Sequence, residues 1–287
     1  MVNVMMNGEW VAPEDAKISV FDHGFLFGDS IYEVVRTRHG ALFAAGMHLK
    51  RLRYSGDQIG LELPWADTLM HDEMEAMAKS VGGEAYVRLV ITRGPGPLSI
   101  NPDGCVNPMR ILFGKPLEVP AAHVYKDGIH IHLSRIRKNP LSKVKGNIKT
   151  GNYLDHVMAF REALAHNCQE ALLLNHRKQV AECTTSNIFW VTRGKLHTPS
   201  LRSGILKGVT RQIVFYLAEQ QGIVCEEGLF PLEELVQADE VFITSTTRDV
   251  LPVSVVGEQR YPVGPITRRL MADFDAIGQV DHLDLKF

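Results

Sequence analysis

The hydrophobic and polar positions of the first half follow the periods of strands and helices in turn. A period of two over residues 85–92 predicts a strand, and it places Tyr86 and Arg88 on the same face. A period near 3.6 residues predicts helices over 47–58 and 67–80. Three methionines share one side of the second helix, which is typical of a hydrophobic core: Met70, Met74 and Met77.

The second half shows the same mixture with more strands. Residues 180–192 are predicted as one continuous strand, and the polar residues 244–247 separate two further strands. A helix is predicted to begin at Gly208 and to end at Gly222. The other elements predicted here are a strand over 129–136, a helix over 152–166 and a strand over 170–175.

This order of elements predicts an α+β fold with two domains. Residues 1–113 are interpreted as a small N-terminal domain, and residues 129–287 as a larger C-terminal domain. Residues 114–128 combine glycine and proline with little periodicity, so we expect them to connect the two domains.

The composition excludes several classes of partner. Among 287 residues, 31 lysines and arginines nearly balance 33 aspartates and glutamates, so charge gives no reason to expect binding to nucleic acid or to a membrane surface. No apolar run reaches the roughly 18 residues that a membrane span needs. The N-terminal residues predict a hairpin that turns at Asn7-Gly8, and they do not resemble a signal peptide.

The cysteines and histidines do not form a metal-binding pattern. The four cysteines lie far apart without a C-x-x-C pair, which is typical of a reducing cytosol, so we expect a cytoplasmic protein. His130 and His132 share one face of a predicted strand, but no third ligand is evident, and they are interpreted as exposed strand residues. No metal site is predicted.

The most specific stretch for chemistry is residues 181–211. It contains a carboxylate, Glu182, and then a predicted helix that begins at Gly208, whose free backbone N–H groups can bind an anion. The small hydroxyl residues of 244–247 could close on the same anion, and Arg51 could add positive charge. Each of these features taken alone is equally typical of a helix cap, a turn or a surface arginine.

Seven motifs are spread over nearly the whole chain. They are "FDHGFLFGDSIYEVVRT", "HLKRL", "NIKTGNYL", "AECTTSNIFW", "GILKGVTR", "EVFITSTTRDVLPV" and "GPITRRL". Together they resemble the fold-type IV, class IV pyridoxal-phosphate aminotransferases, and the family's spacing from the glutamate to the arginine is unbroken from Glu182 to Arg211. The resemblance implies a small α/β domain, a larger pseudo-barrel domain that binds the cofactor, and pyridoxal 5'-phosphate as that cofactor.

The resemblance also implies the residues that hold the cofactor. Lys149 is the implied lysine that forms the Schiff base with the cofactor aldehyde, flanked by Lys143 and Lys145 as solvated charges. Glu182 is implied to pair with the pyridine nitrogen and keep it protonated, while Asn187 holds the strand of that glutamate. The other implied contacts are Tyr153 with the phenolic oxygen, and Arg51, the backbone at Val209, Thr210 and Thr246 with the phosphate.

The implied substrate residues favour an apolar L-amino acid. The Tyr86-x-Arg88 spacing is similar to that of branched-chain aminotransferases, in which the pair helps to hold the substrate carboxylate. An Arg-x-His trap typical of D-amino acid aminotransferases is absent, because the corresponding positions are Leu98 and Ile100. Phe27 and Tyr32 are expected to line the side-chain pocket, and the turn at Thr247 and Arg248 is expected to offer backbone N–H groups to the α-carboxylate.

The resulting hypothesis is a transaminase that moves the amino group of branched-chain L-amino acids to 2-oxoglutarate by a ping-pong mechanism. His23 stands where the family usually has arginine, and the Arg248 guanidinium could instead bind a carboxylate, which favours D- or acidic substrates. A D-amino acid aminotransferase, an aminodeoxychorismate lyase and a small-molecule-binding protein therefore remain alternatives. The resemblance also implies a homodimer, possibly assembled further.

Overall fold

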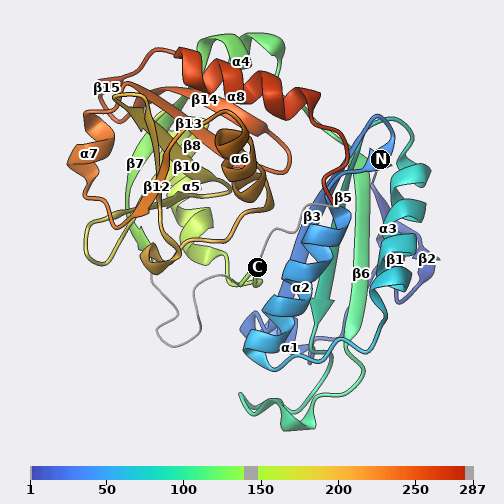
Figure 1. Cartoon of the computed structure of the whole chain (residues 1–287). Helices are drawn as coiled ribbons and strands as arrows, with labels where there is room; N and C mark the ends of the chain where they lie inside the picture. The colour runs from blue at the N-terminus through green and yellow to red at the C-terminus, as the bar shows by residue number, and fades with distance from the viewer. Residues whose placement is uncertain (1, 139–147, 282–287) are drawn as a thin grey trace. The chain divides into compact units, whose positions relative to one another are not determined.

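The computed structural model describes residues 2–138 and 148–281, and these form two compact units that are described separately. The chain leaves the first unit at Glu118, and Val119 begins the second (Figure 1). This point lies inside the segment 114–128, which the sequence predicts as a connection. Part of that segment is nevertheless regular, because strand β6 (Met109–Pro116) enters it and helix α4 (Ala122–Asp127) forms within it. Two later segments, residues 148–152 and 279–281, belong to the first unit.

The first unit is built on one antiparallel sheet. Its strands lie in the order β2-β1-β6-β5-β3-β4. Figure 1 shows α2 and α3 lying alongside the strands β3, β5 and β6 of this unit. Besides β6, its elements are β1 (Asn3–Met6), β2 (Glu9–Val11), α1 (His23–Phe27), β3 (Ser30–Arg38), β4 (Ala41–Leu42), α2 (Ala45–Ile59), α3 (Asp67–Val81) and β5 (Ala85–Thr92).

The core of this unit explains why the periodic patterns predict its elements correctly. Val87, Leu89 and Ile91 point from β5 into the core, while Tyr86 and Arg88 lie on the opposite face, as the period of two predicts. The three methionines of α3 are fully buried in the same core. The hairpin between β1 and β2 turns at residues 7 and 8, whose positive φ angles of 51° and 92° suit asparagine and glycine.

The second unit is built on a larger mixed sheet. Its strands lie in the order β12-β11-β10-β13-β14-β7-β8-β9, with β15 paired to β14, and β7 runs parallel to both of its neighbours. Helices α6 and α8 pack against each other and against β13 or β14. Besides α4, the elements are β7 (Ile129–Lys138), α5 (Leu154–Ala165), β8 (Glu170–Asn175), β9 (Val180–Cys183), β10 (Asn187–Thr192), β11 (Lys195–Pro199), α6 (Val209–Gln220), β12 (Cys225–Gly228), α7 (Leu232–Val236), β13 (Glu240–Ser245), β14 (Asp249–Val256), β15 (Gln259–Arg260) and α8 (Pro265–Ala276). This mixture of helices and sheets confirms the predicted α+β class.

The single strand predicted over residues 180–192 is wrong. The structure has two strands there, β9 and β10, which are separated by a turn at residues 184–186. The turn forms because Glu170 is fully buried and accepts hydrogen bonds from the backbone of Thr184 and from the hydroxyls of Thr184 and Thr185. A buried carboxylate that needs donors therefore interrupts the segment that the sequence predicts as one strand.

Candidate functional site

The residues expected to form the site are divided between the two units. The first unit holds Phe27, Tyr32, Arg51, Tyr86, Arg88 and Lys149, and the second holds Tyr153, Glu182, Asn187, Val209, Thr210, Thr246, Thr247 and Arg248.

Lys149 is held by its backbone at the edge of β3. Its carbonyl oxygen accepts a 3.0 Å hydrogen bond from the N–H of Tyr32, and its own N–H donates to Oγ of Ser55 on α2 at 3.2 Å. The next residue, Thr150, forms a bridge with Ile31. These contacts fix the origin of the side chain, whose Nζ lies 4.3 Å from the ring centre of Tyr32. The flanking lysines of the prediction, at 143 and 145, lie outside the described residues.

A buried ionic cluster is formed by β3 and α2. Nε and Nη2 of Arg51 donate to the two carboxylate oxygens of Glu33 at 2.6 and 2.7 Å, and Nδ1 of His48 lies 2.7 Å from Oε2. Burial raises the pKa of Glu33, but Arg51 and His48 outweigh it and lower the pKa to about 2. Burial also lowers the pKa of His48, with a further contribution from the positive charge of Lys149. Arg51 is thus a preoriented cation.

Glu33 and His48 are absent from the site predicted from the sequence, although both lie inside the quoted motifs. The sequence feature that could have indicated them is the spacing of His48 and Arg51, which lie three residues apart and therefore on one face of a helix. A glutamate between the apolar residues Tyr32 and Val34 completes that signal, because a buried carboxylate needs donors or a cation.

Tyr32 lies between two cations. The guanidinium carbon of Arg88 lies 4.2 Å from its ring centre, a distance typical of a cation–π contact, and Nζ of Lys149 lies at a similar distance. Tyr86 is on the same face of β5 as Arg88, away from the methionine core. This face therefore combines aromatic surface with a positive charge, which suits a small carboxylate with an apolar body.

The loop of residues 94–107 is anchored by a buried histidine. His23 lies at 1% exposure, and its Nε2 is 3.1 Å from the carbonyl oxygen of Pro97. Its ring also makes an edge contact with Phe27, which is partly exposed at the end of α1. Leu98 and Ile100 of the loop are exposed by 76% and 85%. His23 thus has a structural contact at the position where the family usually has arginine.

Glu182 is a buried anion on β9 of the second unit. Its Oε1 accepts from Nζ of Lys138 at 2.6 Å, and its Oε2 accepts from the N–H of Leu206 at 2.8 Å and from Nδ2 of Asn187 at 3.4 Å. Burial raises the pKa of Glu182, but Lys138 and the other donors outweigh burial and lower it. A carboxylate that stays ionised while buried can hold a protonated ring nitrogen. Nδ2 of Asn187 also donates to the carbonyl oxygen of Leu206 at 2.9 Å, so Asn187 links the carboxylate to the segment before α6.

The start of α6 supplies donors suited to an anion. Val209 and Thr210 are its first two residues, and the residue before them, Gly208, has no side chain that could cap the helix. A side chain at Gly208 would collide with Asn187, so glycine is required there. The neighbouring strand β13 packs against α6 and carries Thr244, whose buried hydroxyl has no hydrogen-bond partner among the described residues. Free donor groups of this kind fit a phosphate.

Arg248 is bound to an internal carboxylate. Its Nη2 lies 2.7 Å from Oε2 of Glu170 and also donates to the hydroxyl of Thr185, while its main-chain N–H makes a long contact of 3.4 Å with the carbonyl oxygen of Ser245. Burial raises the pKa of Glu170, but Arg248 and the hydroxyl donors outweigh burial and lower it. Thr246 and Thr247 lie half-buried in the turn between β13 and β14.

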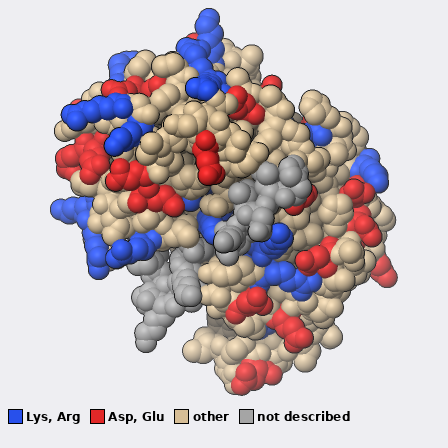
Figure 2. Space-filling view, viewed as in Figure 1, with Lys and Arg blue, Asp and Glu red and all other residues tan. Residues whose placement is uncertain are grey.

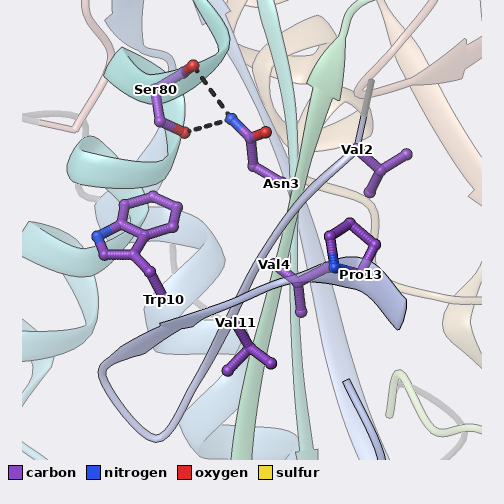
Figure 3. Close-up of a pocket in the computed structure, with 7 residues that line it drawn as sticks. All are labelled: Val2, Asn3, Val4, Trp10, Val11, Pro13 and Ser80. Carbon is purple, nitrogen blue, oxygen red and sulfur yellow. Dashed lines mark hydrogen bonds between the residues drawn. The ribbon is translucent and has the colours of Figure 1, made fainter. Parts of the chain in front are cut away.

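The other features of the described residues do not indicate an alternative functional site. A cavity of about 200 Å³ beside the N-terminal hairpin is lined mainly by apolar side chains, with Asn3 donating to Ser80, and none of the candidate residues lines it (Figure 3). Acidic and basic side chains are interspersed on the face in Figure 2. Within residues 2–138 and 148–281, no helix is long and apolar enough for a bilayer span, and no group of three potential ligands is placed to hold a metal ion.

Comparison with known proteins places these observations in a family. The model of the family described as amino-transferase class IV matches residues 30–256. A protein of Methanocaldococcus jannaschii named "Putative branched-chain-amino-acid aminotransferase" is 35% identical over 280 residues, covering 96% of each chain. The D-alanine aminotransferase of Staphylococcus epidermidis is 34% identical over 283 residues, covering 96% of this chain and 97% of its own.

A solved structure is similar over the same length. The branched-chain amino acid aminotransferase from Escherichia coli aligns with a TM-score of 0.87 and 28% identity, over 98% of this chain and 96% of that one. The chain therefore belongs to the class IV aminotransferases, which confirms the family resemblance and the aminotransferase activity. Enzymes of this class use pyridoxal phosphate, and another similar structure is a branched-chain aminotransferase complexed with N-(5'-phosphopyridoxyl)-L-glutamate.

Proposed function

We propose that this aminotransferase moves the amino group of branched-chain, hydrophobic L-amino acids to 2-oxoglutarate, with Lys149 as its catalytic amine. The observation that carries the proposed chemistry is Glu182, which remains an anion although it is 4% exposed. The substrate class is supported by the aromatic and cationic face of Tyr32, Tyr86 and Arg88. It is also supported by the similarity to branched-chain aminotransferases.

The residues of both units fit pyridoxal phosphate. When bound, this group supplies an aldehyde and an electron-withdrawing ring. In the proposed assignment, Glu182 holds the proton of the ring nitrogen and the hydroxyl of Tyr153 binds the phenolic oxygen. The phosphate is bound by the residues that offer positive charge or free donors: Arg51, the main chain of Val209, Thr210 and Thr246.

Lys149 has two tasks in this proposal. Its Nζ would hold the cofactor aldehyde when no substrate is present, and as a free amine it would take the proton from the α-carbon of the amino acid. The hydrogen bonds from Tyr32 and to Ser55 fix the backbone from which this side chain extends.

The proposed substrate contacts follow from charge and shape. Arg88 and Tyr86 bind the α-carboxylate, and the backbone of Thr247 and Arg248 adds donors to it. Phe27 and Tyr32 offer apolar surface to a branched side chain. The ion pair of Arg248 with the buried Glu170 accounts for this guanidinium without an acidic substrate.

A D-amino acid transaminase is the second candidate, and the similarity to D-alanine aminotransferases favours it. The apolar pair Leu98 and Ile100 argues against it, because neither side chain can bind a carboxylate through charge. Parallel assays with L-leucine and D-alanine, each with 2-oxoglutarate, separate the two. We expect turnover of L-leucine at a kcat/KM at least about tenfold higher, which corresponds to about 1.4 kcal/mol of transition-state preference. A preference for D-alanine would refute the substrate assignment.

Covalent trapping tests the catalytic lysine. Borohydride reduction with pyridoxal phosphate, followed by peptide mapping, should label Lys149 and leave the exposed control Lys195 unmodified. Lys149→Ala should bind the cofactor without a covalent bond and lose turnover. Transamination by that variant at the rate of the unchanged protein would exclude Lys149.

We further propose a cytoplasmic homodimer. The location is supported by the four cysteines, all free thiols, and the dimer by the family. Sedimentation equilibrium should give twice the chain mass of 32.1 kDa, and a monomer mass would refute the dimer.

A further inference from the structure

A chain of hydrogen bonds continues from Glu182 to residues with no assigned role. Nζ of Lys138 lies 2.6 Å from Oε1 of Glu182 and 2.8 Å from Nε2 of His156. Nδ1 of His156 lies 2.6 Å from the carbonyl oxygen of Thr184. The ring of Tyr153 stacks on the imidazole, with 4.4 Å between the ring centres. One series of hydrogen bonds thus links the Glu182 carboxylate to the imidazole on which the Tyr153 ring stacks.

The donors and acceptors of this chain define the state of the imidazole. A carbonyl oxygen can only accept, so Nδ1 of His156 must carry the hydrogen that faces Thr184. The ammonium of Lys138 can only donate, so Nε2 must offer a lone pair. His156 is therefore neutral, as the Nδ1–H tautomer. A second proton on the ring would point an N–H group at an ammonium group.

The three side chains come from three different elements. Lys138 is the last residue of β7, beyond a register shift between Leu133 and Arg137, while Glu182 is on β9 and His156 is in the first turn of α5. Glu182 and His156 are buried, and the side chain of Lys138 is 19% exposed. These hydrogen bonds consequently connect the strands β7 and β9 and the helix α5 through the carboxylate of Glu182.

We propose that Lys138 and His156 are positioning residues, which hold the Glu182 carboxylate ionised in one orientation and hold the Tyr153 ring beside it. This inference rests on the proposed function, in which Glu182 binds the ring nitrogen and Tyr153 the phenolic oxygen of the cofactor. Lys138 uses one lone pair of Oε1 and leaves the other for an N–H group. Lys138 and His156 act through Glu182 and Tyr153 and need no contact with the reacting atoms.

The electrostatics of the carboxylate agree with this role. Burial raises the pKa of Glu182, and the charge of Lys138 is the largest of the opposing contributions that lower it. Without the ammonium, burial would favour the neutral acid. A neutral acid would rotate to donate its proton, so both the charge and the orientation of the group would change.

The first experiment uses the protein without cofactor, so its result does not depend on the proposed function. ¹⁵N NMR of the imidazole should show the Nδ1–H tautomer of His156 at pH 7. Lys138→Met should keep this tautomer, because the carbonyl oxygen of Thr184 still requires a hydrogen on Nδ1, but it should shift the Nε2 resonance, because the donor to Nε2 is lost. Lys138→Arg should keep the Nε2 resonance close to that of the wild type. A wild-type Nε2–H tautomer, or an unchanged spectrum in Lys138→Met, would overturn the inference.

The second experiment uses the enzyme loaded with pyridoxal phosphate. Relative to the matched control Lys195→Met at an exposed position, Lys138→Met should shift the pH at which the cofactor absorption changes. It should also lower kcat on the order of tenfold with KM within about twofold, and Lys138→Arg should restore most of the loss. His156→Phe keeps the aromatic support of Tyr153 but breaks the chain, so it should lower kcat and cannot be rescued by Lys138→Arg.

The outcomes separate this inference from the proposed function. If borohydride fails to label Lys149 in the wild type, the proposed function fails, and the NMR experiment still decides the state of His156. If the wild type is labelled and active while Lys138→Met and His156→Phe match Lys195→Met in absorption and kcat, only the positioning role fails. His156→Phe decides the question if Lys138→Met does not fold by circular dichroism.

Discussion

Replacement of Arg248 by alanine should destabilise the second unit through Glu170. Glu170 is 0% exposed, and its Oε2 lies 2.7 Å from Nη2 of Arg248. Removing one partner of a buried ion pair costs about 3–5 kcal/mol, because the other charge stays buried. The backbone and hydroxyl donors from Thr184 and Thr185 remain, so we expect about 3 kcal/mol, at the low end.

The assay is urea unfolding followed by circular dichroism, with Arg260→Ala as the control. Arg260 is exposed at the end of β15, so its replacement should change the free energy of unfolding by no more than about 0.5 kcal/mol. The double variant Arg248→Ala with Glu170→Gln should recover part of the loss, because the amide leaves no charge buried. A difference below about 0.5 kcal/mol between Arg248→Ala and the control would refute the reasoning.

The pH dependence provides a second check on the same pair. The pKa of Glu170 is lowered from its ordinary value of 4.5 in the folded protein, so its ionised form contributes stability above pH 4.5. This contribution is lost as the pH falls through the folded-state pKa. The gap in unfolding free energy between wild type and Arg248→Ala should therefore narrow below pH 4.5. A gap of constant size would show that the carboxylate charge is not the cause.

Three further predictions follow from the first unit. Glu33→Gln should reduce the unfolding free energy at pH 7 by about 3 kcal/mol, because the pKa of Glu33 is lowered from 4.5 to about 2 in the folded protein. The difference in unfolding free energy between wild type and Glu33→Gln should disappear as the pH falls from 4.5 to about 2. Equal acid sensitivity of both proteins would contradict this. Arg88→Ala should raise KM for L-leucine by about tenfold with kcat little changed, and an unchanged KM would remove Arg88 from the site. Gly28→Ala should lower the free energy of unfolding in urea by about 2 kcal/mol, because φ is +69° and the new Cβ would collide with Asn152. The control Gly83→Ala has φ +74° but open space around the new Cβ, so it should lose only the free energy of the backbone strain.

Local patterns in the sequence predict most of the fold of the first unit. The period of two in β5 gives the shared face of Tyr86 and Arg88, and the helical period gives the buried side of α3. These predictions succeed because each depends on residues within one element. The return of Ile148–Asn152 to the first unit could not be predicted in this way, because it depends on pairing with β3, which lies more than a hundred residues earlier.

Some residues of the candidate site could not be predicted for the same reason, which is that their contacts depend on distant parts of the chain. His156 lies within the helix predicted over 152–166, and Lys138 lies two residues after the strand predicted over 129–136, but nothing local indicates that their side chains meet Glu182 or each other. Lys138 follows several other basic residues and reads as one more solvated charge. The spacing of the motifs indicates Glu182, whereas its partner depends on the register of β7 beside β8.

Buried carboxylates show how far a single sequence can specify such a site. Four of the five buried glutamates in the described part of the chain have a cation from another part of the chain: Glu33 with Arg51, Glu73 with Arg110, Glu170 with Arg248 and Glu182 with Lys138. The fifth, Glu240, accepts hydrogen bonds from the backbone of Ile266 and Thr267 at the start of α8. A buried glutamate predicts that charged or hydrogen-bonding donors must be near, but it does not predict which ones. Three of the four partners are arginines, whose planar group can bind both carboxylate oxygens. The fourth is a lysine that contacts one oxygen of Glu182 and passes its second hydrogen bond to His156. A point donor leaves the second lone pair of Oε1 available, and this is the property that an acid facing a ring nitrogen requires.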